Sequence, residues 1–95
     1  MPAYVILEIE VTDPVIYEDY KKLSPCSLAL YEGKFIVRGG KTETVESDWK
    51  PNCIVVVEFP SMEKAKAWYN SPEYTAAKQI RWKASTGKML LVEGL

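Results

Sequence analysis

Strand-like and helix-like patterns alternate along this sequence in the order β-α-β-β-α-β. Four segments have the pattern of a strand: residues 4–11, 34–46, 53–59 and 88–93. Residues 4–11 alternate in polarity with a period of two, and residues 53–59 (CIVVVEF) are rich in β-branched side chains. The pair Gly39-Gly40 predicts a bend inside the second of these segments, because glycine accepts backbone angles that other residues resist.

The first helical region begins at Asp13-Pro14. There an oxygen-bearing cap precedes a proline whose missing N–H costs nothing at the first helical position. The side chains expected to face inward are Ile16, Tyr20 and Leu23. We expect Ser24-Pro25 to interrupt this helix, because proline removes a backbone donor, and a second short segment to end at Gly33.

The second helical region begins at Ser61, which is placed to cap a helix, and it restarts at Ser71-Pro72. The last helix is expected to end near Ala84. Thr86-Gly87 is then expected to turn the chain into the final strand.

Two βαβ-like halves around a hairpin predict one domain over residues 1–95. Its expected fold is a ferredoxin-like α+β sandwich, with a four-stranded antiparallel sheet and the helices on one face. With 47% of its 95 residues apolar, the chain is long enough for a single core. The side chains expected on the covered sheet face are Val5, Leu7, Ile9, Val55, Val57 and Phe59.

The opposite sheet face is also largely apolar, although no helix is left to cover it. Its expected members are Tyr4, Ile6, Ile54 and Val56, with Glu8 and Glu58 among them. A contiguous apolar face in water is unfavourable by roughly 25 cal/mol per Å² and therefore acts as an association surface. We expect a homodimer in which two sheets pack face to face.

Composition excludes several classes of function. Twelve basic and thirteen acidic residues give a net charge of −1 without a basic block, so we expect no nucleic-acid partner. Glu8 and Glu10 interrupt the N-terminal apolar run, so neither a signal peptide nor a membrane span is expected. Cys26 and Cys53 lack metal or redox spacing and predict two free thiols, buried as small hydrophobes, in a reducing cytoplasm. Histidine is absent, which removes the commonest metal ligand and the usual haem ligand, so we expect no metal and no cofactor.

The segment VRGGKT at residues 37–42 ends with the letters of a phosphate-binding loop. Such a loop needs a glycine five residues before Gly40, and that position is Phe35. It also needs a helix directly after it, whereas the following TETVES alternates as a strand does. A nucleotide site is therefore excluded at this position.

Three segments of the sequence carry a family resemblance. GKFIVRGG (33–40), EFPSMEKAKAWYNSPEY (58–74) and LLVEG (90–94) together resemble domain of unknown function 1330, within the dimeric α+β barrel superfamily. This resemblance spans the whole chain and implies a ferredoxin-like protomer and a face-to-face dimer. It implies no established activity, since relatives in the superfamily include cofactor-independent monooxygenases, isomerases, haem enzymes and ligand-sensing domains.

Arg38 is the first candidate for a substrate-binding residue. It follows three apolar strand residues and precedes the glycine bend, where its planar guanidinium suits a carboxylate or a developing enolate. The alternative is a structural ion pair with Glu8 or Glu58 on a shared sheet face. The sequence leaves both interpretations open.

Further candidate site residues lie on the helices and at a strand end. Tyr20 and Glu58 are candidate catalytic groups, the carboxylate of Glu58 as a general base if it is desolvated. Trp68, Tyr69 and Tyr74 are candidate substrate-binding aromatics. The alternative interpretation makes the aromatic rings part of the core and pairs Glu58 with a nearby cation.

Two classes of function agree with these residues. One is a cofactor-independent enzyme that acts on a small enolisable or aromatic anion in a pocket between helices and sheet. The other is a non-catalytic ligand-binding or sensing domain with the same pocket. A dimer whose aromatics fill the pocket, and which therefore has only a structural role, is a third possibility.

Overall fold

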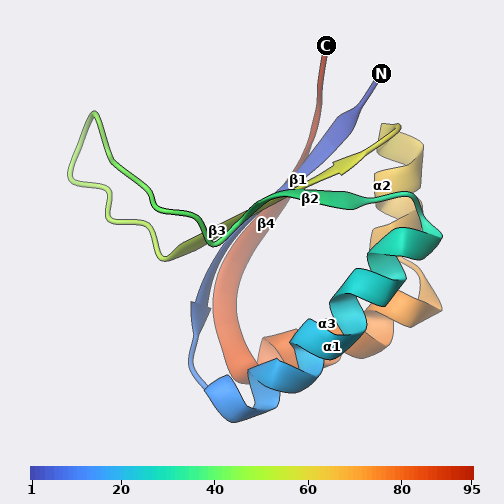
Figure 1. Ribbon diagram of the computed structural model, residues 1–95, viewed down its shortest axis with the longest axis horizontal. Helices are drawn as coiled ribbons and strands as arrows, with labels where there is room; N and C mark the ends of the chain where they lie inside the picture. Colours follow the sequence, from blue (N-terminus) through green and yellow to red (C-terminus); the bar gives the residue numbers. More distant parts are fainter.

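One antiparallel sheet carries a layer of helices on one of its faces in the computed structural model, which describes residues 1–95 (Figure 1). The elements are β1 (Ala3–Val11), α1 (Pro14–Leu30), β2 (Lys34–Arg38), β3 (Cys53–Phe59), α2 (Met62–Tyr69), α3 (Pro72–Ala84) and β4 (Ser85–Glu93). The strand order is β2-β3-β1-β4, so the two outer β-α-β connections place β1 and β3 at the centre of the sheet. The predicted α+β architecture is confirmed. No helix is long and apolar enough to cross a membrane.

The two sheet faces differ in burial as the alternation predicts. On the covered face the buried side chains are Val5, Leu7, Ile9, Val57 and Phe59, and Val55 is half-buried. On the open face an apolar row crosses the whole sheet, because Val56 lies opposite both Ile6 and Val37, and Ile6 lies opposite Leu90. Ile6 and Leu90 are 36% and 54% exposed, so the protomer leaves this row largely in water.

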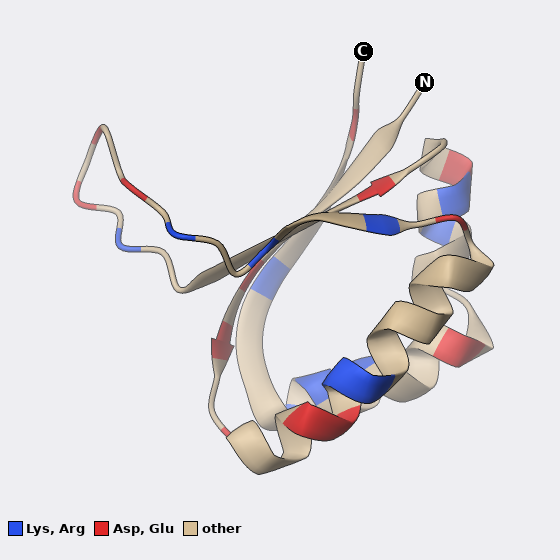
Figure 2. Ribbon diagram, in the orientation of Figure 1, with Lys and Arg blue, Asp and Glu red and all other residues tan.

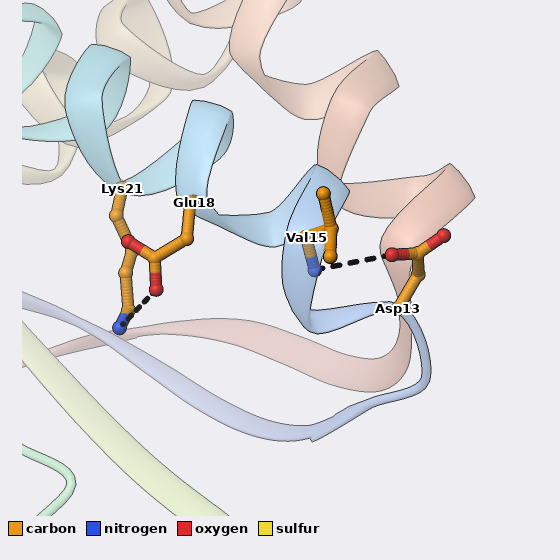
Figure 3. Close-up of polar contacts among 4 residues, drawn as sticks. All are labelled: Asp13, Val15, Glu18 and Lys21. Carbon is orange, nitrogen blue, oxygen red and sulfur yellow. Dashed lines mark hydrogen bonds and ion pairs between the residues drawn. The ribbon is translucent and has the colours of Figure 1, made fainter.

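The predicted helix starts are confirmed at atomic level. The Asp13 Oδ1 atom accepts a hydrogen bond from the backbone N–H of Val15 at 3.1 Å (Figure 3). It also accepts one from the backbone N–H of Ile16 at 3.1 Å. Ser61 and Ser71 cap α2 and α3 in the same way, through side-chain oxygens that accept from backbone N–H groups in the first turn. These caps satisfy donors that a helix N-terminus otherwise leaves unpaired.

Helix α1 continues through Pro25, so the predicted interruption is wrong. A proline inside a helix removes one backbone hydrogen bond at a cost of about 3 kcal/mol. Here α1 packs against α3, and Ser27 Oγ donates to the Ser24 carbonyl at 2.8 Å. The packing of a long helix outweighs the local defect. Ser24 and Ser27 face inward, whereas the predicted inward Leu23 is 43% exposed.

Strand β2 ends at Arg38, eight residues before the predicted end of the extended segment. Gly39 has a φ of +71°, which confirms the glycine bend. Residues 39–52 then form an exposed loop that projects from the body and carries both acidic and basic residues (Figures 1 and 2). This segment does not form the predicted strand. The pairing of β2 with β3 ends at Arg38 and Val55, and the residues after Arg38 have no strand partner in the sheet.

The predicted turn at Thr86-Gly87 is also wrong. Helix α3 passes directly into β4 at Ser85, and Gly87 lies within the strand opposite Ile9. A Cβ atom at Gly87 would stand 2.5 Å from the backbone oxygen of Glu8. Glycine is present here because two backbones approach closely, not because the chain turns.

We therefore expect Gly87→Ala to destabilise the fold, because the new methyl group must push β1 and β4 apart. Overpacking of this kind costs about 1 to 3 kcal/mol. Urea denaturation followed by tryptophan fluorescence measures the change. Gly40→Ala is the matched control, since its Cβ would meet nothing within 4 Å. Equal stability of the two variants would contradict the close approach.

Candidate functional site

A pocket of about 590 Å³ lies between the N-terminal half of α1 and the sheet. Its floor is apolar and comes from the covered sheet face: Leu7, Ile9, Phe35 and Val55. Its polar groups come from α1 and from the end of β2: Tyr17, Glu18, Tyr20, Lys21, Ser24 and Arg38. An apolar chamber with a few polar side chains is the usual composition of a site for a small organic ligand.

The rest of the space between helices and sheet is filled by aromatic rings. Trp68 and Tyr74 stack with ring centroids 3.9 Å apart, and Phe59 lies 5.4 Å from Trp68. Trp68 and Tyr74 are 2% and 0% exposed, and Tyr69 is half-buried beneath the Lys78 ammonium group at 3.9 Å. The structure therefore places Trp68, Tyr69 and Tyr74 in or beside the core, and none of them lines the pocket.

Arg38 lines the pocket, and an irregularity in β2 explains its position. The register of β2 shifts between Phe35 and Val37, so Phe35 lies opposite Val57 and Arg38 lies opposite Val55. Residues three apart thereby share one face, where a regular strand would place them on opposite faces. The Arg38 guanidinium carbon stands 4.3 Å from the centroid of the Phe35 ring, an attractive cation–π geometry.

The structural alternative for Arg38, an ion pair with Glu8 or Glu58, is absent. Glu58 pairs with Lys34 at 3.1 Å, and the Glu8 carboxylate accepts from the Asn52 backbone N–H at 3.4 Å. Both glutamates lie on the open sheet face, where their cross-strand partners are Ile54 and Tyr4. Arg38 lies on the other face, toward the helices. Glu58 accordingly lies outside the pocket in which a general base would be needed.

Tyr20 joins the pocket to the core. Its hydroxyl lies 3.0 Å from the hydroxyl of Tyr74, and the Tyr17 and Tyr20 ring centroids are 5.3 Å apart. Burial raises the pKa of Tyr17 to about 12, with a further contribution from Tyr20, while the charges of Arg81 and Arg38 act in the opposite direction. Tyr17 is therefore a protonated hydrogen-bond donor at neutral pH.

An ion pair stands on the α1 side of the pocket. Glu18 and Lys21, both exposed and both among the lining residues, pair at 3.3 Å and extend from the helix toward the strands (Figure 3). The sequence reading missed Tyr17, Lys21 and Ser24 as lining residues. The sequence signal is the helical spacing of these residues. Tyr20, Lys21 and Ser24 follow Tyr17 by three, four and seven positions, which places all four on one face of a helix.

The cysteines lie apart from each other and remain free, as predicted. The prediction that they are buried is wrong, since both are exposed. Cys53 lies at the start of β3 and lines the pocket beside Gly39, at 3.3 Å from the position of a Cβ on that glycine.

A family model with the description "Domain of unknown function (DUF1330)" matches residues 2–95. No curated protein matches the sequence. Among solved structures, a protein of unknown function from Rhodopseudomonas palustris superimposes with a TM-score of 0.77 at 17% identity, covering 99% of this chain and 82% of that one.

Two further structures extend the comparison. SnoaB, a cofactor-independent oxygenase from Streptomyces nogalater, gives a TM-score of 0.67 at 17% identity over 99% of this chain and 93% of its own. A dimeric protein of unknown function with a ferredoxin-like fold from Bacteroides fragilis gives 0.64 at 14% identity, over 98% and 96%. The ferredoxin-like fold predicted from the sequence is confirmed.

The raised pKa of Tyr17 predicts a pH dependence of stability. A phenol whose pKa is higher in the folded chain contributes stability that is present below pH 10 and is lost as the pH rises toward about 12. We expect Tyr17→Phe to weaken this loss and to remove one late ionisation step from the titration at 295 nm. Removal of a step near pH 10 would contradict the burial of Tyr17.

Proposed function

The chain belongs to the family described as Domain of unknown function (DUF1330), and from that premise we propose that this member binds a small organic anion with an apolar body. The observation that carries the proposal is the Arg38 guanidinium, which lines an apolar pocket and has no carboxylate partner. An arginine in such a position is matched by a ligand that brings the carboxylate itself.

The shape and lining of the pocket favour an aromatic or enolisable ligand. Its floor of leucine, isoleucine, valine and phenylalanine side chains favours a flat apolar body. Tyr17 and Tyr20 line the pocket from α1, and we expect the Tyr17 hydroxyl to donate to a second ligand oxygen. A volume of about 590 Å³ accommodates a molecule of one to three rings.

A second candidate function is catalysis without a cofactor in the same pocket. The arginine and the protonated Tyr17 supply donors for an oxygen on which negative charge develops, and such donors stabilise enolate-like transition states. The similar fold of a cofactor-independent oxygenase motivates a search for turnover. Tyr20 stays a candidate for a proton-transferring group, whereas Glu58 has no place in this proposal because it lies outside the pocket.

We also propose that the protein is a homodimer through the open sheet face. The row of Val37, Val56, Ile6 and Leu90 is continuous, apolar and uncovered. Packing against the same row of a second copy removes both from water with twofold symmetry. Similar proteins described as dimeric support this assembly.

The ligand proposal is tested by substitution of Arg38. A thermal-shift screen of small aromatic carboxylates and phenols identifies a binder, whose affinity is then measured by calorimetry. Arg38→Lys keeps the charge and loses the two-pronged geometry, so affinity falls while stability barely changes. For Arg38→Met we expect a loss of about 1.5 to 3 kcal/mol of binding free energy, the usual contribution of a charged hydrogen bond.

Lys66→Met provides the control for Arg38→Met. It removes the same unit of charge from an exposed position on α2, outside the pocket, and is expected to leave the affinity unchanged. Unchanged affinity in Arg38→Met, or a screen without any binder, argues against the proposal.

The dimer is tested at Val56, in the middle of the apolar row. Val56→Asp places a carboxylate where two sheets meet, and burial of an unpaired charge is strongly unfavourable. Sedimentation at micromolar concentration is expected to show a dimer for the wild type and a monomer for the variant. Val15→Asp, at an 80% exposed position on α1, is expected to remain dimeric. A monomeric wild type would refute the assembly.

A further inference from the structure

The exposed loop between β2 and β3 stands on the open side of the sheet. Figure 1 shows residues 39–52 projecting from the sheet on the side away from the helices. At the base of the loop, the Asn52 backbone N–H donates to the Glu8 carboxylate at 3.4 Å, and Glu8 lies on the open face opposite Ile54. A hollow lined by Trp49 of the loop and by Ile54 of the sheet joins the two surfaces. A molecule that covers the open face therefore meets the loop as well.

The tip of this loop is held in shape by its own hydrogen bonds. Thr44 Oγ1 donates to the Trp49 carbonyl at 2.6 Å, and the Trp49 backbone N–H donates to Ser47 Oγ at 3.1 Å. Between them Ser47 has a φ of +75°, the left-handed conformation that reverses the direction of a chain. Both backbone polar groups of Trp49 are thus satisfied within the loop. A side chain placed in advance binds a partner at a lower entropic cost.

The loop presents large apolar side chains to water. Trp49 is 57% exposed and Val45 is 89% exposed. Charged neighbours flank the tryptophan in the sequence, Asp48 before it and Lys50 after it. Tryptophan is enriched among the residues that contribute most to protein–protein binding, and charged residues are typical of the rim around them. The loop therefore has the composition of an interface anchor with a polar rim.

We infer that the β2–β3 loop is an arm that packs against a second copy of the chain, with Trp49 as its anchor. The inference rests on the proposed homodimer and deepens it, because the loop and the open sheet face lie on the same side of the protomer. A second copy seated on that face lies beside the loop. Twofold symmetry then gives each copy one loop to present and one to receive. Packing of the two loops removes both Trp49 rings from water, in addition to the apolar rows of the sheets.

The anchor is tested by Trp49→Ala in sedimentation experiments over a dilution series. We expect the dimer dissociation constant to rise about thirtyfold, which is the change that corresponds to the loss of an interface hot spot. Trp82→Ala is the matched control, since Trp82 is 59% exposed but lies on α3, in the helical layer. It is expected to leave the dissociation constant unchanged. The same constant for both variants and the wild type would overturn the inference, while the dimer itself would stand.

A role of Trp49 in the interface is separated from a role in the fold by the Val56→Asp variant, which is expected to be monomeric. In this background Trp49→Ala is expected to leave the urea midpoint unchanged, because the ring is exposed in the protomer. A clear loss of stability in the monomer would make Trp49 a residue of the fold and would contradict the inference.

Fluorine NMR of protein labelled with 5-fluorotryptophan tests the contact without a substitution in the loop. Trp49→Phe and Trp82→Phe assign the two exposed tryptophans, and dilution or Val56→Asp provides the monomer. We expect the Trp49 resonance to differ between dimer and monomer and the Trp82 resonance to stay in place. A Trp49 resonance that is the same in both states would exclude the arm alone. A wild type that stays monomeric at every concentration would exclude the homodimer and the arm together.

Discussion

The stacking of Trp68 against Tyr74 connects all three helices, and the rest of the structure depends on it. The two rings, 3.9 Å apart, join α2 to α3. The Trp68 indole N–H donates to Ser27 Oγ at 3.1 Å, which ties α1 to the same point. Phe59 from β3 closes the cluster against the sheet. Large rings in one end of the interlayer space hold the helices at a fixed distance from the sheet along their whole length.

That fixed distance creates the pocket at the other end. Beneath the first turns of α1 the sheet presents Ile9 and Val55, which line the pocket. The space left there is bordered by polar groups of α1 and by Arg38. Core and candidate site are thus two ends of one layer, linked at Tyr20 and Tyr74 by the hydroxyl pair.

Local sequence patterns predicted most of the fold. They failed at positions where contacts with residues far along the chain determine the local structure. The caps at Asp13, Ser61 and Ser71 were predictable because capping involves residues within one turn. The continuation of α1 through Pro25 was not, since its stability comes from α3. Gly87 reads as a turn in isolation, and only the approach of β1 shows why it must be glycine.

The sequence by itself determined the order of elements, the two apolar sheet faces and the absence of histidine chemistry, because these depend on residue type and local period. Only the tertiary structure decided which candidate residues meet. A one-residue shift in β2 turns Arg38 toward the helices and away from Glu8 and Glu58, and no local pattern encodes that shift. Three buried aromatic residues of one core cluster likewise differ in place: Tyr20 also lines the pocket, whereas Trp68 and Tyr74 do not. Aromatic side chains of similar character thus occupy different places in the fold. Their places depend on the distances between packed elements, and a single segment of sequence does not encode those distances.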